Sequence, residues 1–213
     1  MPRTYTSDVR AEQSRRTRAA ILEAAAQLFL EQGWVATTMA RVGERSGVAR
    51  QTVYLLFPSK LALLDACIDA ALLGGGSDAT GGAASRVRDL PGYRRMAEGT
   101  FDVRVRAGAE WLAGAHQRSA RIQRVLDEAA VGDPVAAARL AEREQTRWRE
   151  VRWAMTLVLA DPEPDPAVVD GVWTLASRDV WLKLVGQRGW TSEAWQEWFA
   201  GMLAGYRGHA TDE

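Results

Sequence analysis

Four helix-boundary signals lie close together between residues 38 and 59, and they constrain the fold more than any other feature of the sequence. Thr38 is a good N-cap for a helix, and Gly47 can adopt the left-handed conformation that a tight turn requires. Pro58 interrupts the chain, after which Ser59 can cap the next helix. These signals predict two short helices joined by a glycine turn, the second from about Ala49 to Phe57. Their inward residues would be Met39, Val42, Val53 and Phe57.

Helical periodicity continues on both sides of this segment, whereas alternating strand patterns are nearly absent. Upstream, apolar residues from Ile21 to Phe29 recur with helical spacing, and Gly33 is expected to end that helix. The predicted fold class is therefore all-α. The further helices are expected at Lys60–Leu73, 93–99, 100–116, 119–131, 134–160, 166–187 and 191–206.

Composition excludes several classes of protein. Of the 213 residues, 47% are hydrophobic and 25% are charged, as in ordinary globular proteins. No apolar run approaches the ~18 residues of a membrane span, and the polar, arginine-rich N-terminus does not resemble a signal peptide. We therefore expect a cytoplasmic location. A single cysteine, Cys67, and two histidines leave no basis for a disulfide or a multi-residue metal site, so we expect no metal and no cofactor.

Charge is distributed unevenly along the chain. Residues 1–60 contain nine basic and five acidic residues, a balance of +4, and residues 61–213 have a balance of −4. A basic N-terminal segment favours a polyanionic partner at one end only. We predict one domain over residues 1–60 and a second over residues 61–213. The glycine-rich stretch within residues 74–90 is predicted to be a flexible loop.

The residue types around the predicted turn are those that read DNA. Arg50 and Gln51 would begin the second helix, which enters the major groove in DNA-binding helix-turn-helix proteins. Arginine pairs with guanine and glutamine with adenine, each through two hydrogen bonds. Phosphate or methyl contacts are predicted for Thr52, Tyr54 and Lys60, and the basic residues Arg15, Arg16 and Arg18 would either follow the DNA or form a solvated tail.

Residues 19–64 resemble the DNA-binding domain of the tetracycline-repressor (TetR) family of bacterial transcription regulators. The similarity rests on Ile21, Ala24, Ala25, Phe29, Gly33, Trp34, Thr37, Thr38, Met39, Val42, Gly47, Val48, Thr52, Tyr54, Phe57, Ser59, Lys60 and Leu63. The resemblance implies DNA contacts for Thr38, Arg50, Gln51, Thr52, Tyr54 and Lys60. It also implies an N-terminal three-helix DNA-binding domain followed by a helical dimerisation and effector-binding domain.

Three residues depart from the family pattern, and each is expected to weaken the domain. Gly43 replaces the usual alanine, which costs a helix roughly 1 kcal/mol. Ala49 replaces a frequent serine cap, worth about 1 kcal/mol. Leu61 replaces a glutamate that would be favourable at a helix start.

Tryptophan is unusually abundant in the C-terminal two-thirds of the chain, where eight of the nine tryptophans lie. Large aromatic residues serve cores, pockets and interfaces equally well. Trp111, Trp148 and Trp153, with His116, are candidates for lining an effector pocket, and plain core packing is the alternative. We expect a small, mostly hydrophobic effector, and the helix from Lys60 is the expected lever to the DNA-binding domain.

The last two predicted helices are broadly amphipathic. They would close the core of one subunit or, as the resemblance implies, form a four-helix interface in a homodimer. The residues predicted at that interface are Val172, Leu175, Trp195, Trp198, Phe199 and Met202.

The sequence thus predicts a homodimeric regulator, a repressor that binds a palindromic double-stranded operator and is released by its effector. An enzyme is disfavoured, because no nucleophile–base pair and no phosphate-binding loop occurs. The remaining alternative is a protein-interaction or co-regulator module whose helix-turn-helix no longer binds DNA.

Overall fold

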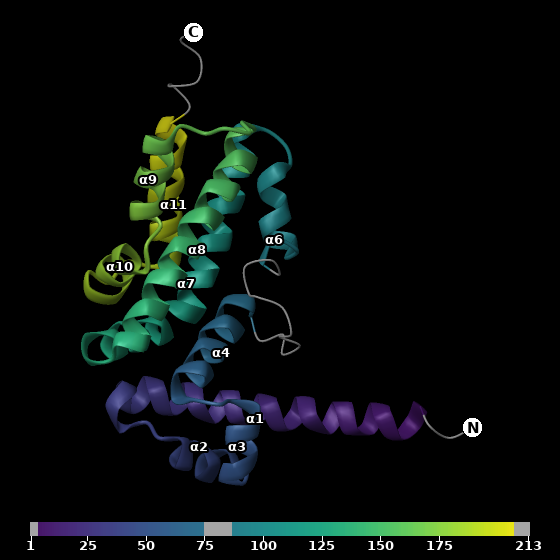
Figure 1. Ribbon diagram of the computed structural model, residues 1–213. Helices are drawn as coiled ribbons and strands as arrows, with labels where there is room; N and C mark the ends of the chain where they lie inside the picture. Colours follow the sequence, from purple (N-terminus) through teal and green to yellow (C-terminus); the bar gives the residue numbers. More distant parts are fainter. Residues whose placement is uncertain (1–3, 75–86, 207–213) are drawn as a thin grey trace. The chain divides into compact units, whose positions relative to one another are not determined.

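The computed structural model describes residues 4–74 and 87–206, with side chains from residue 10 onward, and all of its regular elements are helical (Figure 1). The predicted all-α class is confirmed. The elements are α1 (Thr4–Ala36), α2 (Met39–Ser46), α3 (Arg50–Leu56), α4 (Lys60–Leu73), α6 (Pro91–Arg94), η1 (Arg95–Ala97), α7 (Phe101–Gly132), α8 (Pro134–Leu159), α9 (Pro166–Leu175), α10 (Arg178–Trp181), the π-helix η2 (Leu182–Gln187) and α11 (Ser192–Ala204).

The chain forms two compact units, which we call unit 1 and unit 2. Unit 1 comprises Met1–Thr80 and Arg121–Leu140, and unit 2 comprises Gly81–Ala120 and Ala141–Glu213. Unit 1 therefore includes the end of α7 and the start of α8 in addition to the first four helices. This division follows packing, whereas the boundary predicted after residue 60 concerns function and stays a prediction.

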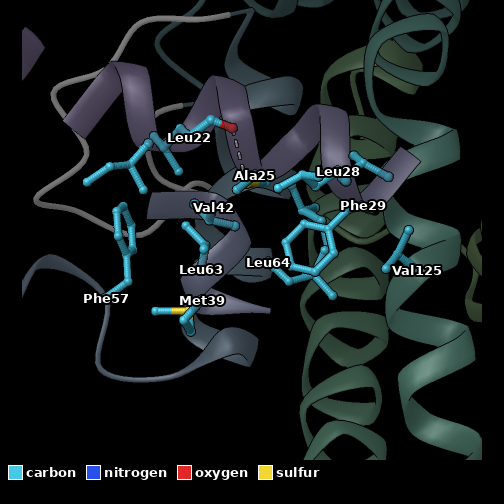
Figure 2. Close-up of a cluster of buried hydrophobic side chains, with 14 of the residues drawn as sticks. Leu22, Ala25, Leu28, Phe29, Met39, Val42, Phe57, Leu63, Leu64 and Val125 are labelled. Atoms are coloured by element: carbon cyan, nitrogen blue, oxygen red, sulfur yellow. Dashed lines mark hydrogen bonds between the residues drawn. The ribbon is translucent and has the colours of Figure 1, made fainter. Parts of the chain in front are cut away.

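The core of unit 1 is built from aliphatic side chains and two phenylalanines, as Figure 2 shows. Phe29 of α1 and Leu64 of α4 lie next to Val125, which α7 contributes from a distant part of the sequence. Cys67 is also buried here, its thiol donates to the Leu22 carbonyl oxygen at 3.6 Å, and burial raises the pKa of the thiol to about 12. The thiol is therefore protonated at neutral pH.

The helix-boundary signals of residues 38–59 act as predicted. The Thr38 hydroxyl accepts a hydrogen bond from the Arg41 backbone N–H, and the Ser59 hydroxyl accepts one from Ala62. Gly47 ends α2 with a φ of 68°. These local signals position α3 between two capped helices.

Helix α1 differs from the prediction at both ends. It begins at Thr4, so Arg15, Arg16 and Arg18 lie on a helix and not on a disordered tail. Gly33 breaks the helical conformation with a φ of 73°, and the chain resumes a short helical segment to Ala36. Gly33, which was predicted to end the helix, therefore produces a kink within it.

The chain after α4 differs from the prediction in its helix boundaries. The two helices expected at 100–116 and 119–131 form one continuous helix, α7, because Gln117 and Arg118 between them are good helix formers. The helix expected at 166–187 is divided into α9, α10 and η2, because Ser177 caps a new helix through Val180. The predicted loop at residues 74–90 lies mostly outside the described residues; Gly74 ends α4 in the left-handed conformation.

Within the described residues, no helix combines the length and apolar character needed to cross a membrane.

Candidate nucleic-acid interface

Helices α2 and α3 meet at a turn that requires a glycine at position 43. The Val48 backbone N–H donates to the Gly43 carbonyl oxygen at 3.0 Å, and a Cβ atom on Gly43 would lie 2.9 Å from the Val48 carbonyl oxygen. A side chain there would push the turn open. The expectation that Gly43 merely weakens α2 is therefore incomplete, because the glycine permits the close approach that orients α3.

One face of helix α3 packs in the core of unit 1, and the opposite face is exposed to solvent. Val53 of α3 and Phe57, which directly follows the helix, are buried in the core of unit 1, and Leu56 packs against that core. On the opposite side Tyr54 is 41% exposed and Leu55 is 84% exposed, and Arg50 and Gln51 are also exposed. Four neighbouring side chains are therefore available to a partner without disturbing the core.

Two of the predicted readout residues contact each other. The guanidinium carbon of Arg50 lies 5.5 Å from the centre of the Tyr54 ring, within the range of a cation–π contact. Gln51 is exposed next to them, and Thr52 is half-buried on the side of α3. The structure brings Arg50, Gln51 and Tyr54 to one surface, with Thr52 at its margin.

Lys60 has a partner within unit 1. Its ammonium donates to the Trp34 carbonyl oxygen at 2.8 Å and lies 4.0 Å from the centre of the Trp34 ring. Burial lowers the pKa of Lys60, and the negative charge of Asp133 acts in the opposite direction. Lys60 therefore holds the segment after the α1 kink in place, whatever further contact its other N–H groups make.

The three N-terminal arginines have different surroundings. Arg15 and Arg16 form ion pairs with Glu12, and hydrogen bonds from Arg15 and Arg16 lower the pKa of that carboxyl group. The guanidinium of Arg18 lies 4.5 Å from the centre of the Phe57 ring, at the end of α3. Arg18 thus supports α3 structurally, whereas Arg15 and Arg16 are solvent-exposed.

The two other departures from the family pattern have distinct outcomes. Ala49 precedes α3 with no side-chain hydrogen bond to the helix, as expected. Leu61 packs against the core of unit 1, so it contributes apolar contact where a glutamate would contribute charge.

Sequence reasoning missed Leu55 on this surface. A helical projection of α3 identifies it, because Leu55 lies opposite the residues that anchor the helix.

Two of the three tryptophans predicted to line an effector pocket, Trp111 and Trp153, are joined by a chain of contacts in unit 2. The Tyr93 and Trp111 rings pack edge to face at 5.1 Å, and the Tyr93 hydroxyl donates to the Glu150 carbonyl oxygen at 3.2 Å. Arg88 donates to both carboxylate oxygens of Glu150 and covers the Trp153 ring. Trp111 and Trp153 therefore belong to one cluster.

His116 and Trp148 have partners that explain their positions without a ligand. His116 Nε2 lies 3.1 Å from the Ala176 carbonyl oxygen, and burial lowers the pKa of the ring to about 3, so the neutral ring donates this bond. It satisfies a carbonyl freed where α9 ends. The Trp148 indole N–H donates to Asp170 at 2.8 Å.

The residues predicted at a dimer interface divide into inner and outer sets. Val172, Trp195 and Phe199 are buried within unit 2, with Trp195 0% exposed, so their side chains have no surface to offer a second subunit. Leu175 and Trp198 are half-buried, and Met202 is 40% exposed. A partner chain would therefore meet the outer set alone.

Comparison with known proteins agrees with the resemblance of the N-terminal region to the TetR family. Residues 21–67 match the family model "Bacterial regulatory proteins, tetR family". The regulator TtgR of Pseudomonas putida is 40% identical over 58 residues, 27% of this chain and 28% of TtgR. ArpR of Pseudomonas putida has the same identity and coverage. The matched region spans about 28% of the length of these curated relatives.

Solved structures are similar over nearly the whole chain. A protein of Mesorhizobium loti MAFF303099 assigned to the TetR family has a TM-score of 0.66 at 15% identity, covering 92% of this chain and 97% of that chain. The flavonoid-responsive regulator FrrA has a TM-score of 0.59 at 25% identity, covering 90% and 94%.

The fold and the α2–α3 surface define a helix-turn-helix protein with a helical C-terminal region. Within it, residues 21–67 are similar to the DNA-binding region of the TetR family of bacterial regulatory proteins.

Proposed function

We propose that this protein is a transcriptional repressor that binds a palindromic operator as a homodimer and is released by a small, mostly hydrophobic effector. The observation that carries the proposal is the exposed face of α3, which presents Arg50, Gln51, Tyr54 and Leu55 while Val53 and Phe57 anchor the helix. A recognition helix needs this combination of a fixed backbone and an uncommitted outer surface.

The individual roles follow from chemistry and position. Arg50 and Gln51 are proposed to read base edges, and Thr38, Thr52 and Tyr54 to contact the DNA backbone. Arg15 and Arg16 are exposed and would add phosphate contacts once DNA competes with Glu12. Lys60 and Arg18 are proposed to position the domain, since both have contacts within unit 1.

Dimerisation would follow from the outer surface of the last helices. Trp198, Met202 and Leu175 retain exposed area in the single chain, and apolar contact between copies would cover it. In a twofold dimer the two recognition helices would lie about 34–36 Å apart, which matches successive turns of the major groove. The operator would then be an approximate palindrome.

The effector is proposed to bind in unit 2 near the cluster of Trp111, Tyr93 and Trp153. The Trp111 indole N–H is buried without a hydrogen-bond partner among the described residues. A planar ligand with a hydrogen-bond acceptor would supply one. The similar protein FrrA is described as flavonoid-responsive, which fits this ligand class.

Mobility-shift measurements on the DNA upstream of the gene test the proposal. The wild type should bind this DNA in preference to random DNA, and Arg50→Ala should lose about 10- to 100-fold on it. Arg106→Ala is the control, because Arg106 is an exposed arginine of unit 2. Equal affinity of the wild type for both DNAs would favour the alternative, a protein-interaction module.

A further inference from the structure

The direction in which α3 points away from the core can be derived from its buried residues. Successive residues of a helix are rotated by about 100° around its axis. Val53, Leu56 and Phe57 mark the side that faces the core. The opposite direction falls between Gln51 and Leu55, which are one helical turn apart, while Arg50 and Tyr54 lie on the flank. The centre of the exposed face is therefore a glutamine–leucine pair.

Leu55 lies outside the core of unit 1. It is 84% exposed, and the core of unit 1 contains its neighbours Val53 and Phe57 but not Leu55. A single exposed leucine is common on protein surfaces and needs no explanation by itself. This one lies at the centre of a face whose other members are all polar or aromatic, on the helix that is proposed to enter DNA.

We infer that Leu55 contacts the 5-methyl group of a thymine and thereby helps to select the operator. The thymine methyl is the one apolar group that base pairs present in the major groove, and apolar side chains recognise it. Gln51, one turn away, has the amide that pairs with adenine N6 and N7. The inference rests on the proposed DNA binding and specifies which bases it selects.

The spacing of the pair limits the sequence that it can read. Residues four apart on a helix are separated by about 6 Å along its axis. Successive base pairs of DNA are separated by about 3.4 Å. Gln51 and Leu55 would then contact A·T pairs one or two steps apart, so each half-site should contain an adenine and a thymine at that spacing.

Charge favours DNA over a protein as the occupant of this face. Helix α3 contains one charged residue, Arg50, and no carboxylate. Residues 1–60 as a whole carry nine basic and five acidic residues. An apolar centre with an arginine and no carboxylate on the same helix suits the major groove, where the methyl group lies between phosphate backbones.

The test removes the methyl group from the DNA. The full-length protein is used to select binding sequences from a random library, and each thymine of the selected site is then replaced by uracil, which lacks only the 5-methyl group. Fluorescence anisotropy measures the affinity of each duplex for the wild type, Leu55→Ala and Leu55→Met. Val135→Ala serves as the control, because Val135 is an exposed apolar residue of unit 1 outside α3.

The expected result is a loss of about three- to tenfold for the wild type at one thymine per half-site. Leu55→Ala should bind the thymine duplex with the same loss and show no further loss on uracil. Leu55→Met and Val135→Ala should retain the sensitivity to uracil.

Two results would overturn the inference, and they are distinguishable. If sequences are enriched but uracil has the same effect on the wild type and Leu55→Ala, Leu55 does not read thymine, and the proposed function stands. If no sequence is enriched, the proposed DNA recognition fails and the inference fails with it.

Discussion

Unit 1 and unit 2 bury different kinds of side chain. The core of unit 1 is aliphatic and phenylalanine-rich, and its buried polar residue Thr37 has its hydroxyl hydrogen-bonded to the Gly33 carbonyl oxygen. Unit 2 buries His116 against Trp181 and Trp195 and buries Arg178 beside Glu144, and the buried indole N–H groups of Trp111, Trp173 and Trp195 have no partner among the described residues. Buried donors without acceptors cost free energy.

This contrast is consistent with the different roles proposed for the two units. A helix that reads DNA must be presented rigidly, and an apolar core with capped helices achieves that. An interior with unpaired donors and paired charges is costly for stability alone, but it can gain from a ligand that supplies acceptors. Changes to apolar contacts should therefore act most strongly in unit 1, and changes to charge and protonation in unit 2.

The largest effect is expected from Phe29→Ala in unit 1. Phe29 is buried and stacks with Trp34 at 6.1 Å between ring centres. Its truncation should lower the free energy of unfolding by about 3–5 kcal/mol. Urea denaturation followed by far-UV circular dichroism measures this, with the exposed Leu55→Ala as control. A loss below about 1 kcal/mol would contradict the tight packing described for unit 1.

Glu144→Gln should have the next largest effect and should act through charge in unit 2. Glu144 accepts hydrogen bonds from Arg147 and from the buried Arg178. Glutamine would direct an amide N–H₂ toward arginine donors, so we expect a loss of about 2–3 kcal/mol, reduced from the fully buried case by partial exposure. Glu98→Gln alters an exposed carboxylate of the same unit and should be neutral by the same denaturation measurement.

Unit 2 should become less stable at mildly acidic pH, because His116 is protonated there in the unfolded protein but stays neutral in the folded protein. Burial lowers the pKa of His116 to about 3, with Arg147 and Arg178 acting in the same direction, whereas an unfolded histidine titrates near pH 6.5. Between these values the unfolded state binds more protons, so stability falls as the pH falls. We expect a loss of about 1–2 kcal/mol between pH 7 and pH 5.

Thermal unfolding at several pH values measures this loss, and tryptophan fluorescence reports mainly on unit 2, because Trp34 is the one tryptophan before residue 111. In His116→Gln, the amide can still donate to Ala176 but does not titrate. If this variant loses as much stability as the wild type between pH 7 and pH 5, another group is responsible.

The smallest effect is expected from Ala49→Ser, which tests how much helix capping stabilises unit 1. Serine would supply the side-chain acceptor that α3 lacks and should stabilise the protein by about 0.5–1 kcal/mol. Thr38→Ala, which removes the acceptor from α2, should destabilise it by a similar amount. A change of the same sign in both variants would show that capping does not govern these helices.

The sequence predicted unit 1 better than unit 2 because the signals in unit 1 are local. Thr38, Gly47 and Ser59 act on residues three or four positions away, so their effect can be read directly. The division between α9 and α10 is different, since the Ala176 carbonyl oxygen is satisfied by His116, sixty residues earlier. No local pattern contains that contact.

The candidate site was predictable from the sequence only in part. Arg50 and Gln51 lie on the exposed face of α3 as expected, although their contact with DNA stays a prediction. Lys60 could not be assigned from sequence, because its partner Trp34 is 26 residues away. The aromatic stripe of α11 likewise could not reveal that Trp195 faces inward and Met202 outward, since helical spacing alone does not say which side faces the core.

The separation of α3 into an anchored and an exposed face has a consequence for how such regulators diversify after gene duplication. Substitutions at Arg50, Gln51 and Leu55 change the outer surface while Val53 and Phe57 keep the helix in place. Exposed substitutions generally alter stability by less than about 0.5 kcal/mol. Under the proposed function, a duplicated copy could therefore acquire a new operator through mutations that selection for folding does not remove, and related regulators in one genome could separate their target genes.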